Sequence, residues 1–107
     1  YLALLSEFKL KSLPKVSAYN QSVWAQFTIE VENRDKVKGH LSEKGIPTAV
    51  HYPVPLNKQL AVEDLNAYLP VSENASKHVI RLPMSPYLSS DNQKMVVREI
   101  NSIIENF

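Results

Sequence analysis

The chain has 107 residues, which is room for a single domain. Hydrophobic residues make up 44% of it and charged residues 21%, so a buried core can form and disorder is not expected. Lys and Arg number 12 and Asp and Glu 11, and the resulting net charge of +1 gives no electrostatic reason to bind nucleic acid or a membrane surface. The absence of cysteine excludes disulfides and thiolate chemistry, and no apolar run is long enough for a membrane span.

A helix and a strand are predicted in the first third of the chain. Helical spacing of apolar residues predicts a helix over residues 1–13 that ends before Pro14, and these residues are Tyr1, Leu2, Leu5 and Phe8. The stripe begins at the first residue without a capping residue, so we expect residues 1–13 to be the tail of a helix in a longer chain. Apolar and polar residues alternate over 23–32, which predicts a half-buried strand, with Trp24 packed under a helix.

The middle of the chain predicts a helix followed by irregular structure. Asn33 is a plausible N-cap for a helix over residues 34–44, which Gly45 ends. Residues 48–52 form an extended piece that two prolines close. A short helix is expected around residues 59–65.

The last third predicts helical turns over residues 72–78 with Ser72 as cap, a short strand over 79–82, and a final helix. Ser90 and Gln93 fit a capping box at the start of that helix. Its buried face is predicted to comprise Val96, Ile100, Ile103, Ile104 and Phe107. Strands and helices mixed in this order predict an α+β fold, with a small antiparallel or mixed sheet and helices on one face.

The three histidines are the first candidates for chemistry. His40, His51 and His78 lack the spacing of metal ligands, so no metal site is predicted, and His40 lies within an amphipathic helix. His51 differs, because it stands at the end of an extended segment in AVHYPVPL, where Pro53 and Pro55 stiffen the loop. From the residues alone, two alternatives remain open. His51 and Tyr52 form a binding group, or His51 is merely exposed and Tyr52 caps the edge of the core.

Four segments, in order, carry a family resemblance: SVWAQFTI (22–29), NRDKVKGHLSEKGIPTAVHYPVPLNKQ (33–59), LPVSENAS (69–76) and IRLPMSPYLS (80–89). Together they resemble the C-terminal domain of the DegT/DnrJ/EryC1/StrS family of pyridoxal-phosphate-dependent sugar aminotransferases. The branch that acts on UDP-linked keto sugars is the most similar. The resemblance covers nearly the whole chain, so residues 1–107 are expected to form one domain, the small C-terminal domain of a fold-type-I aminotransferase.

The resemblance implies a reaction in which an amino acid, usually glutamate, donates its amino group to a keto sugar nucleotide. Family members hold pyridoxal phosphate (PLP) mainly in a large N-terminal domain, which carries the Schiff-base lysine and is absent from these residues. This chain is therefore expected to bind no PLP by itself, to hold no catalytic residue and to be inactive alone. A homodimer in the cytoplasm, with the large domain and the sugar nucleotide as partners, is also implied.

The resemblance also names candidate substrate-binding residues. His51 and Tyr52 correspond to a loop that faces the cleft in relatives, and Gln59 ends the same motif. Asn57 stands where relatives commonly have histidine; an amide can still form hydrogen bonds but carries no proton near neutral pH. The alternative hypothesis is a non-catalytic α+β module for self-association or protein binding.

Overall fold

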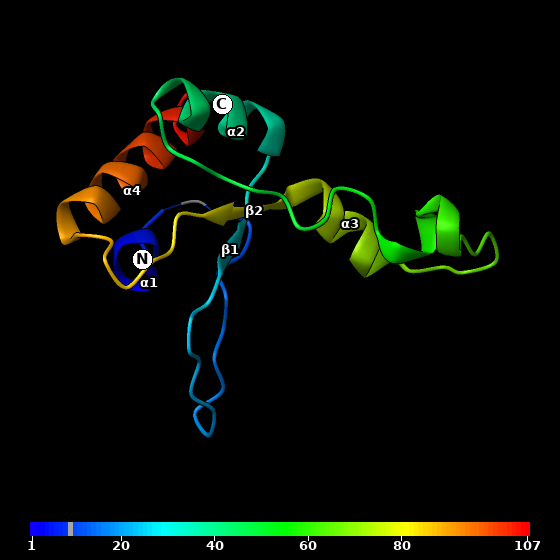
Figure 1. Cartoon of the computed structure of the whole chain (residues 1–107). Coiled ribbons are helices and arrows are strands. Elements are labelled where there is room, and N and C mark those ends of the chain that lie inside the picture. Colours follow the sequence, from blue (N-terminus) through cyan, green and yellow to red (C-terminus); the bar gives the residue numbers. More distant parts are fainter. Residues whose placement is uncertain (9) are drawn as a thin grey trace.

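The structure is a computed structural model that describes residues 1–8 and 10–107. Its helices and strands are α1 (Leu2–Leu5), β1 (Phe27–Glu30), α2 (Arg34–Glu43), α3 (Pro70–His78), β2 (Val79–Leu82) and α4 (Ser90–Ile104). Two 3-10 turns, η1 (Leu56–Lys58) and η2 (Leu60–Val62), lie between α2 and α3 (Figure 1). No helix in residues 1–8 or 10–107 combines the length and the hydropathy that crossing a membrane requires.

The centre of the fold is an antiparallel pair of strands. β1 and β2 pair from Phe27↔Leu82 to Glu30↔Val79. A single bridge extends the pairing on each side, Ser12 to Glu30 and Ala49 to Arg81. The predicted α+β fold with a small antiparallel sheet is therefore confirmed.

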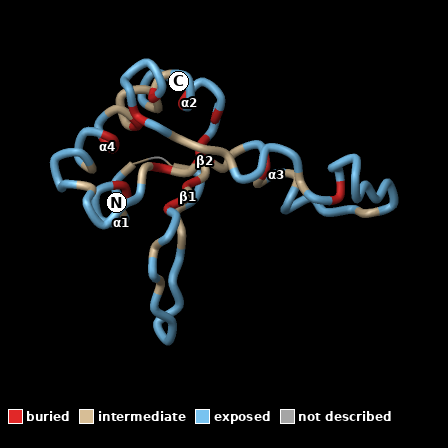
Figure 2. The backbone as a smooth tube through the Cα atoms, in the orientation of Figure 1, coloured by how far each residue is buried: buried red, intermediate tan, exposed pale blue. Residues whose placement is uncertain are grey.

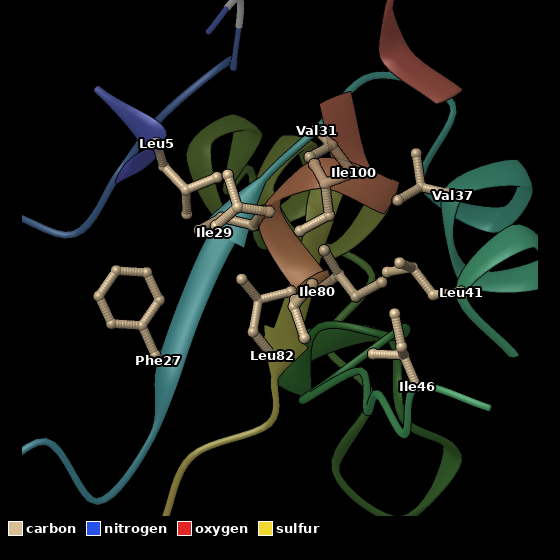
Figure 3. Packing of buried hydrophobic residues seen from close by; sticks show 12 residues of the cluster. Leu5, Phe27, Ile29, Val31, Val37, Leu41, Ile46, Ile80, Leu82 and Ile100 are labelled. Atoms are coloured by element: carbon tan, nitrogen blue, oxygen red, sulfur yellow. The ribbon is translucent and has the colours of Figure 1, made fainter. Parts of the chain in front are cut away.

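The hydrophobic core lies between one face of this sheet and the helices α2 and α4, which pack against each other (Figure 3). Alternate strand residues point into it, as a half-buried sheet requires. The fully buried side chains at its centre are Leu5, Ile29, Val31, Val37, Leu41, Ile80, Leu82 and Ile100. The predicted face of the last helix is confirmed for Val96 and Ile100, whereas Phe107 lies beyond the helix and is 51% exposed.

The helix α2 begins and ends nearly where the sequence predicts. Gly45 has a positive φ of 70°, its N–H donates to Ser42 O at 2.9 Å, and the N–H of Ile46 donates to Leu41 O at 2.9 Å. These are the two hydrogen bonds of a Schellman motif, in which glycine takes the left-handed position at least cost. The motif turns the chain back so that Ile46 packs into the core.

Two predictions for the N-terminal third are wrong. The first helix ends at Leu5 instead of residue 13, because the N–H groups of Lys11 and Ser12 donate to Glu30 O at 3.1 and 3.3 Å. Lys9, within that predicted helix, lies outside the described residues. The predicted strand 23–32 is confirmed only over Phe27–Glu30, since Trp24 has a positive φ of 50° that no strand accommodates.

Further corrections concern helix starts. The helix α3 begins at Pro70 instead of using Ser72 as its cap, which suits a proline because the first helical position needs no N–H. The cap of α4 is Ser89, one residue before the predicted Ser90, and its hydroxyl accepts from the N–H of Asn92. The short helix expected over 59–65 is replaced by the turns η1 and η2.

Two segments extend away from this core. Residues 13–26 form a long loop beyond β1, and residues 52–69 reach outward beside α3 (Figure 1). Both are mostly exposed in the burial colouring of Figure 2, although Asn57 in the second segment is buried. Large apolar side chains on them are 84–92% exposed, namely Tyr19, Val23, Leu60, Leu65 and Tyr68.

Candidate functional site

A cleft of about 680 Å³ lies where the outward segment leaves the core. One wall is the proline-rich loop, which contributes His51, Tyr52, Val54, Pro55, Leu56 and Gln59. The other wall is α3 with the start of β2, which contributes Ser72, Ala75, Ser76 and Val79. The volume is of the size that small-molecule sites have.

The structure brings His51 and Tyr52 together at this cleft. Their rings stack, with centroids 5.4 Å apart and planes 25° from parallel. Tyr52 is 69% exposed, so it does not cap the edge of the core and its ring remains available for contact. An imidazole and a phenol side by side offer donors, acceptors and a flat apolar surface to a polar ring.

Gln59 also lines the cleft, and it holds the loop in shape. Its side-chain amide donates to Val54 O at 3.3 Å, which closes the loop across five residues. The adjacent Lys58 lies 3.0 Å from Glu73 of α3 and lowers the pKa of that carboxyl. The loop is therefore stabilised by a hydrogen bond within it and by an ion pair to α3, which forms the opposite wall of the cleft.

Asn57 is placed differently from the other three predicted residues. It is 8% exposed and is not among the residues that line the cleft. Its carbonyl accepts from the N–H of Asp64 at 3.0 Å, and its side-chain hydrogen bond to Glu73 further lowers the pKa of that carboxyl. Asn57 thus lies behind the loop and contributes to its anchoring on α3.

Sequence reasoning missed the second wall of the cleft. Ser72, Ala75, Ser76 and Val79 recur at i, i+3, i+4 and i+7, the spacing of one helix face, and this signal was present in the sequence. Arg34 at the start of α2 supports this wall, because its Nη1 donates to the carbonyl oxygens of Ser76 and Val79, both at 3.3 Å.

The lining of the cleft is mainly apolar and carries a few polar side chains, none of which is a lysine, an arginine or a carboxylate within the described part of the chain. In the same residues, no cluster of His, Asp or Glu could hold a metal ion. Imidazole, phenol, amide and serine hydroxyl groups suit a hydroxyl-rich ligand such as a sugar ring. The same lining does not fit PLP, because a Schiff base needs a lysine.

Comparison with known proteins identifies the family of this chain. The sequence model of the DegT/DnrJ/EryC1/StrS aminotransferase family matches residues 1–101. A Pseudomonas aeruginosa protein named UDP-2-acetamido-2-deoxy-3-oxo-D-glucuronate aminotransferase is 48% identical over 83 residues, or 78% of this chain and 23% of the relative.

Solved structures show the same fold. A DegT DnrJ EryC1 StrS aminotransferase from Brucella abortus has a TM-score of 0.85 and 36% identity over 96% of this chain and 28% of its own. Streptomyces venezuelae DesV, solved with a ketimine intermediate, has a TM-score of 0.89 and 30% identity over 97% of this chain and 29% of its own. The chain thus spans about a quarter of the length of the relatives it matches. It belongs to the DegT/DnrJ/EryC1/StrS aminotransferase family.

Proposed function

We propose that this chain is the small domain of an aminotransferase that transfers an amino group to a UDP-linked keto sugar, and that it positions the sugar. The observation that carries the proposal is the cleft with the His51–Tyr52 pair at its mouth. Membership of the family and the UDP-linked keto sugar in the name of the Pseudomonas relative support the substrate class.

Three side chains contact the sugar nucleotide in this proposal. The Tyr52 ring lies against the apolar face of the sugar, and the His51 imidazole and the Gln59 amide bind its oxygens. Asn57 acts from behind the loop by holding it against α3. These residues bind and orient the substrate, so they are binding residues rather than catalytic ones.

The amino transfer itself needs groups from outside these residues. PLP supplies the electron sink when bound, and glutamate is the proposed amino donor. In this proposal the Schiff-base lysine comes from a large N-terminal domain of a longer chain, and the cleft, which no lysine lines in the described residues, supplies only binding groups. We further propose that the parent enzyme is a cytoplasmic homodimer and that the 107 residues alone are inactive.

The test is transamination by the complete product of the gene. A UDP-linked 3-keto sugar and glutamate are supplied, and formation of 2-oxoglutarate is measured. Tyr52→Ala is expected to raise KM for the sugar nucleotide about tenfold with a smaller change in kcat, because the contact serves binding. The matched control is Tyr87→Ala, which removes a tyrosine that is 93% exposed and outside the cleft.

Two results would contradict the proposal. Transamination by the 107-residue chain alone would show that the missing lysine is not needed. A complete gene product without transaminase activity that self-associates in sedimentation experiments would favour the alternative of a binding module, which the exposed apolar side chains on residues 13–26 and 52–69 would then serve.

A further inference from the structure

A smaller hollow of about 190 Å³ adjoins the cleft. The two cavities share the residues Val54, Pro55 and Ser76 in their walls, so they are neighbours between the proline-rich loop and α3. Sites that enclose a whole small molecule begin at roughly 300 Å³. The hollow is therefore too small for a separate organic ligand, and it suits one group of a ligand whose larger part occupies the cleft.

The hollow carries the positive charge that the cleft lacks. Lys58 of η1 and Lys77 of α3 line it, one from each wall, together with the carboxylate of Glu73. Two lysines and one carboxylate give the described lining a net charge of +1. The side chain of Lys58 is 54% exposed and Lys77 is exposed as well, so both ammonium groups are accessible to an incoming anion.

Glu73 is close to both lysines and leaves them donors to spare. Lys58 Nζ lies 3.0 Å from Glu73 Oε2, and its hydrogen bond, with a smaller effect from the charge of Lys77, lowers the pKa of the Glu73 carboxyl. Lys77 forms no ion pair within residues 1–8 and 10–107. Because an ammonium group has three donors, Lys58 can hold Glu73 and a ligand oxygen at the same time.

We propose that Lys58 and Lys77 bind the diphosphate of the nucleotide-linked substrate, while its sugar lies in the cleft against His51 and Tyr52. The diphosphate is bonded directly to the sugar, so its site must adjoin the sugar site, as the hollow adjoins the cleft. Ammonium groups bind phosphate oxygens as point charges without a fixed orientation, which suits two exposed and flexible side chains. This inference rests on the proposed function and deepens it.

The test measures the dissociation constant of UDP-glucose, a stable probe with a diphosphate and a neutral sugar, by calorimetry on the complete gene product. Lys58→Gln and Lys77→Gln are each expected to weaken binding about fivefold, because each removes one exposed charge contact. The double variant is expected to weaken it more than about tenfold. Added salt should weaken binding to the wild type more than to the double variant, because salt screens exposed charges.

Two further variants separate direct binding from other effects of charge. Lys94→Gln removes the same charge from an exposed position on α4 outside both cavities, and it should leave the dissociation constant within about twofold. Glu73→Gln tests whether Lys58 only supports the loop. The new amide still accepts a hydrogen bond from Lys58 but adds no negative charge to the hollow, so binding should be at least as tight as in the wild type. Circular dichroism of each variant establishes that it is folded.

Three results overturn the inference. Unchanged binding in the double variant shows that the diphosphate is not bound here. Equal weakening in Glu73→Gln and Lys58→Gln assigns Lys58 to support of the loop. Loss of PLP absorbance from the double variant, with unchanged binding of UDP-glucose, assigns the lysines to the phosphate of the cofactor. Failure of the proposed function is distinct, since the wild-type protein would then neither transaminate nor bind UDP-glucose.

Discussion

Replacing Arg34 by methionine tests how the wall of the cleft is supported. Arg34 is only 9% exposed, and its guanidinium donates to the carbonyl oxygens of Ser76 and Val79, both at 3.3 Å. A hydrogen bond to a charged group contributes about 1.5–3 kcal/mol, and these long bonds belong at the lower end, so their sum is about 3 kcal/mol. Methionine has no charge to desolvate on folding, and this gain offsets part of that sum. We therefore expect Arg34→Met to lower the free energy of unfolding by about 2 kcal/mol.

Urea unfolding followed by the fluorescence of Trp24, the single tryptophan, measures this change. With a slope of about 2 kcal/mol per molar urea, the midpoint should fall by about 1 M. The matched control is Arg98→Met, whose side chain is 74% exposed and whose ion pair to Glu99 spans 4.0 Å, so a change below about 0.5 kcal/mol is expected. If the two variants unfold at the same urea concentration, the hydrogen bonds from Arg34 do not stabilise α3 and β2.

Two other expectations follow from single contacts. Ser89→Ala removes the hydroxyl that accepts from the N–H of Asn92 at 3.1 Å and should cost about 1 kcal/mol in urea unfolding, whereas Ser90→Ala should cost less than half of that. Burial raises the pKa of Tyr1 to about 12, and its hydroxyl donates to Pro83 O at 2.8 Å. The native state thus holds this proton more tightly than the unfolded chain does, so its contribution to stability is complete below pH 10 and is lost as pH rises toward 12. The urea midpoint of wild type minus that of Tyr1→Phe should shrink over this interval, and a constant difference would contradict the assignment.

The parts of the fold that the sequence predicts are those with local signals. The helix α2 has a glycine stop, β2 is an apolar run cut by proline, and α4 repeats its apolar face at helical spacing. Lys11 and Ser12 stand within the predicted first helix but pair with Glu30, which is 19 and 18 residues further along, and no local pattern reveals such a partner. Likewise, nothing in the sequence around Trp24 predicts its left-handed backbone.

Only the loop wall of the candidate site could be predicted from the sequence. Two prolines beside His51 and Tyr52 mark a stiff loop, and the structure places both side chains at a cleft. The opposing wall on α3 depends on tertiary structure, because only folding brings Ser72 and Ser76 to that loop. Asn57 sits in the same motif as the exposed residues, and only packing reveals that it is buried.

The strands β1 and β2 are neighbours in space, yet residues 31–78 lie between them in the chain. Closing so long a loop costs entropy before any strand hydrogen bond forms, so we expect this pairing to form late in folding. Both walls of the cleft lie within or directly beside the closed loop. We therefore expect the cleft to assemble together with the sheet, so that a chain that has formed only its helices has no cleft.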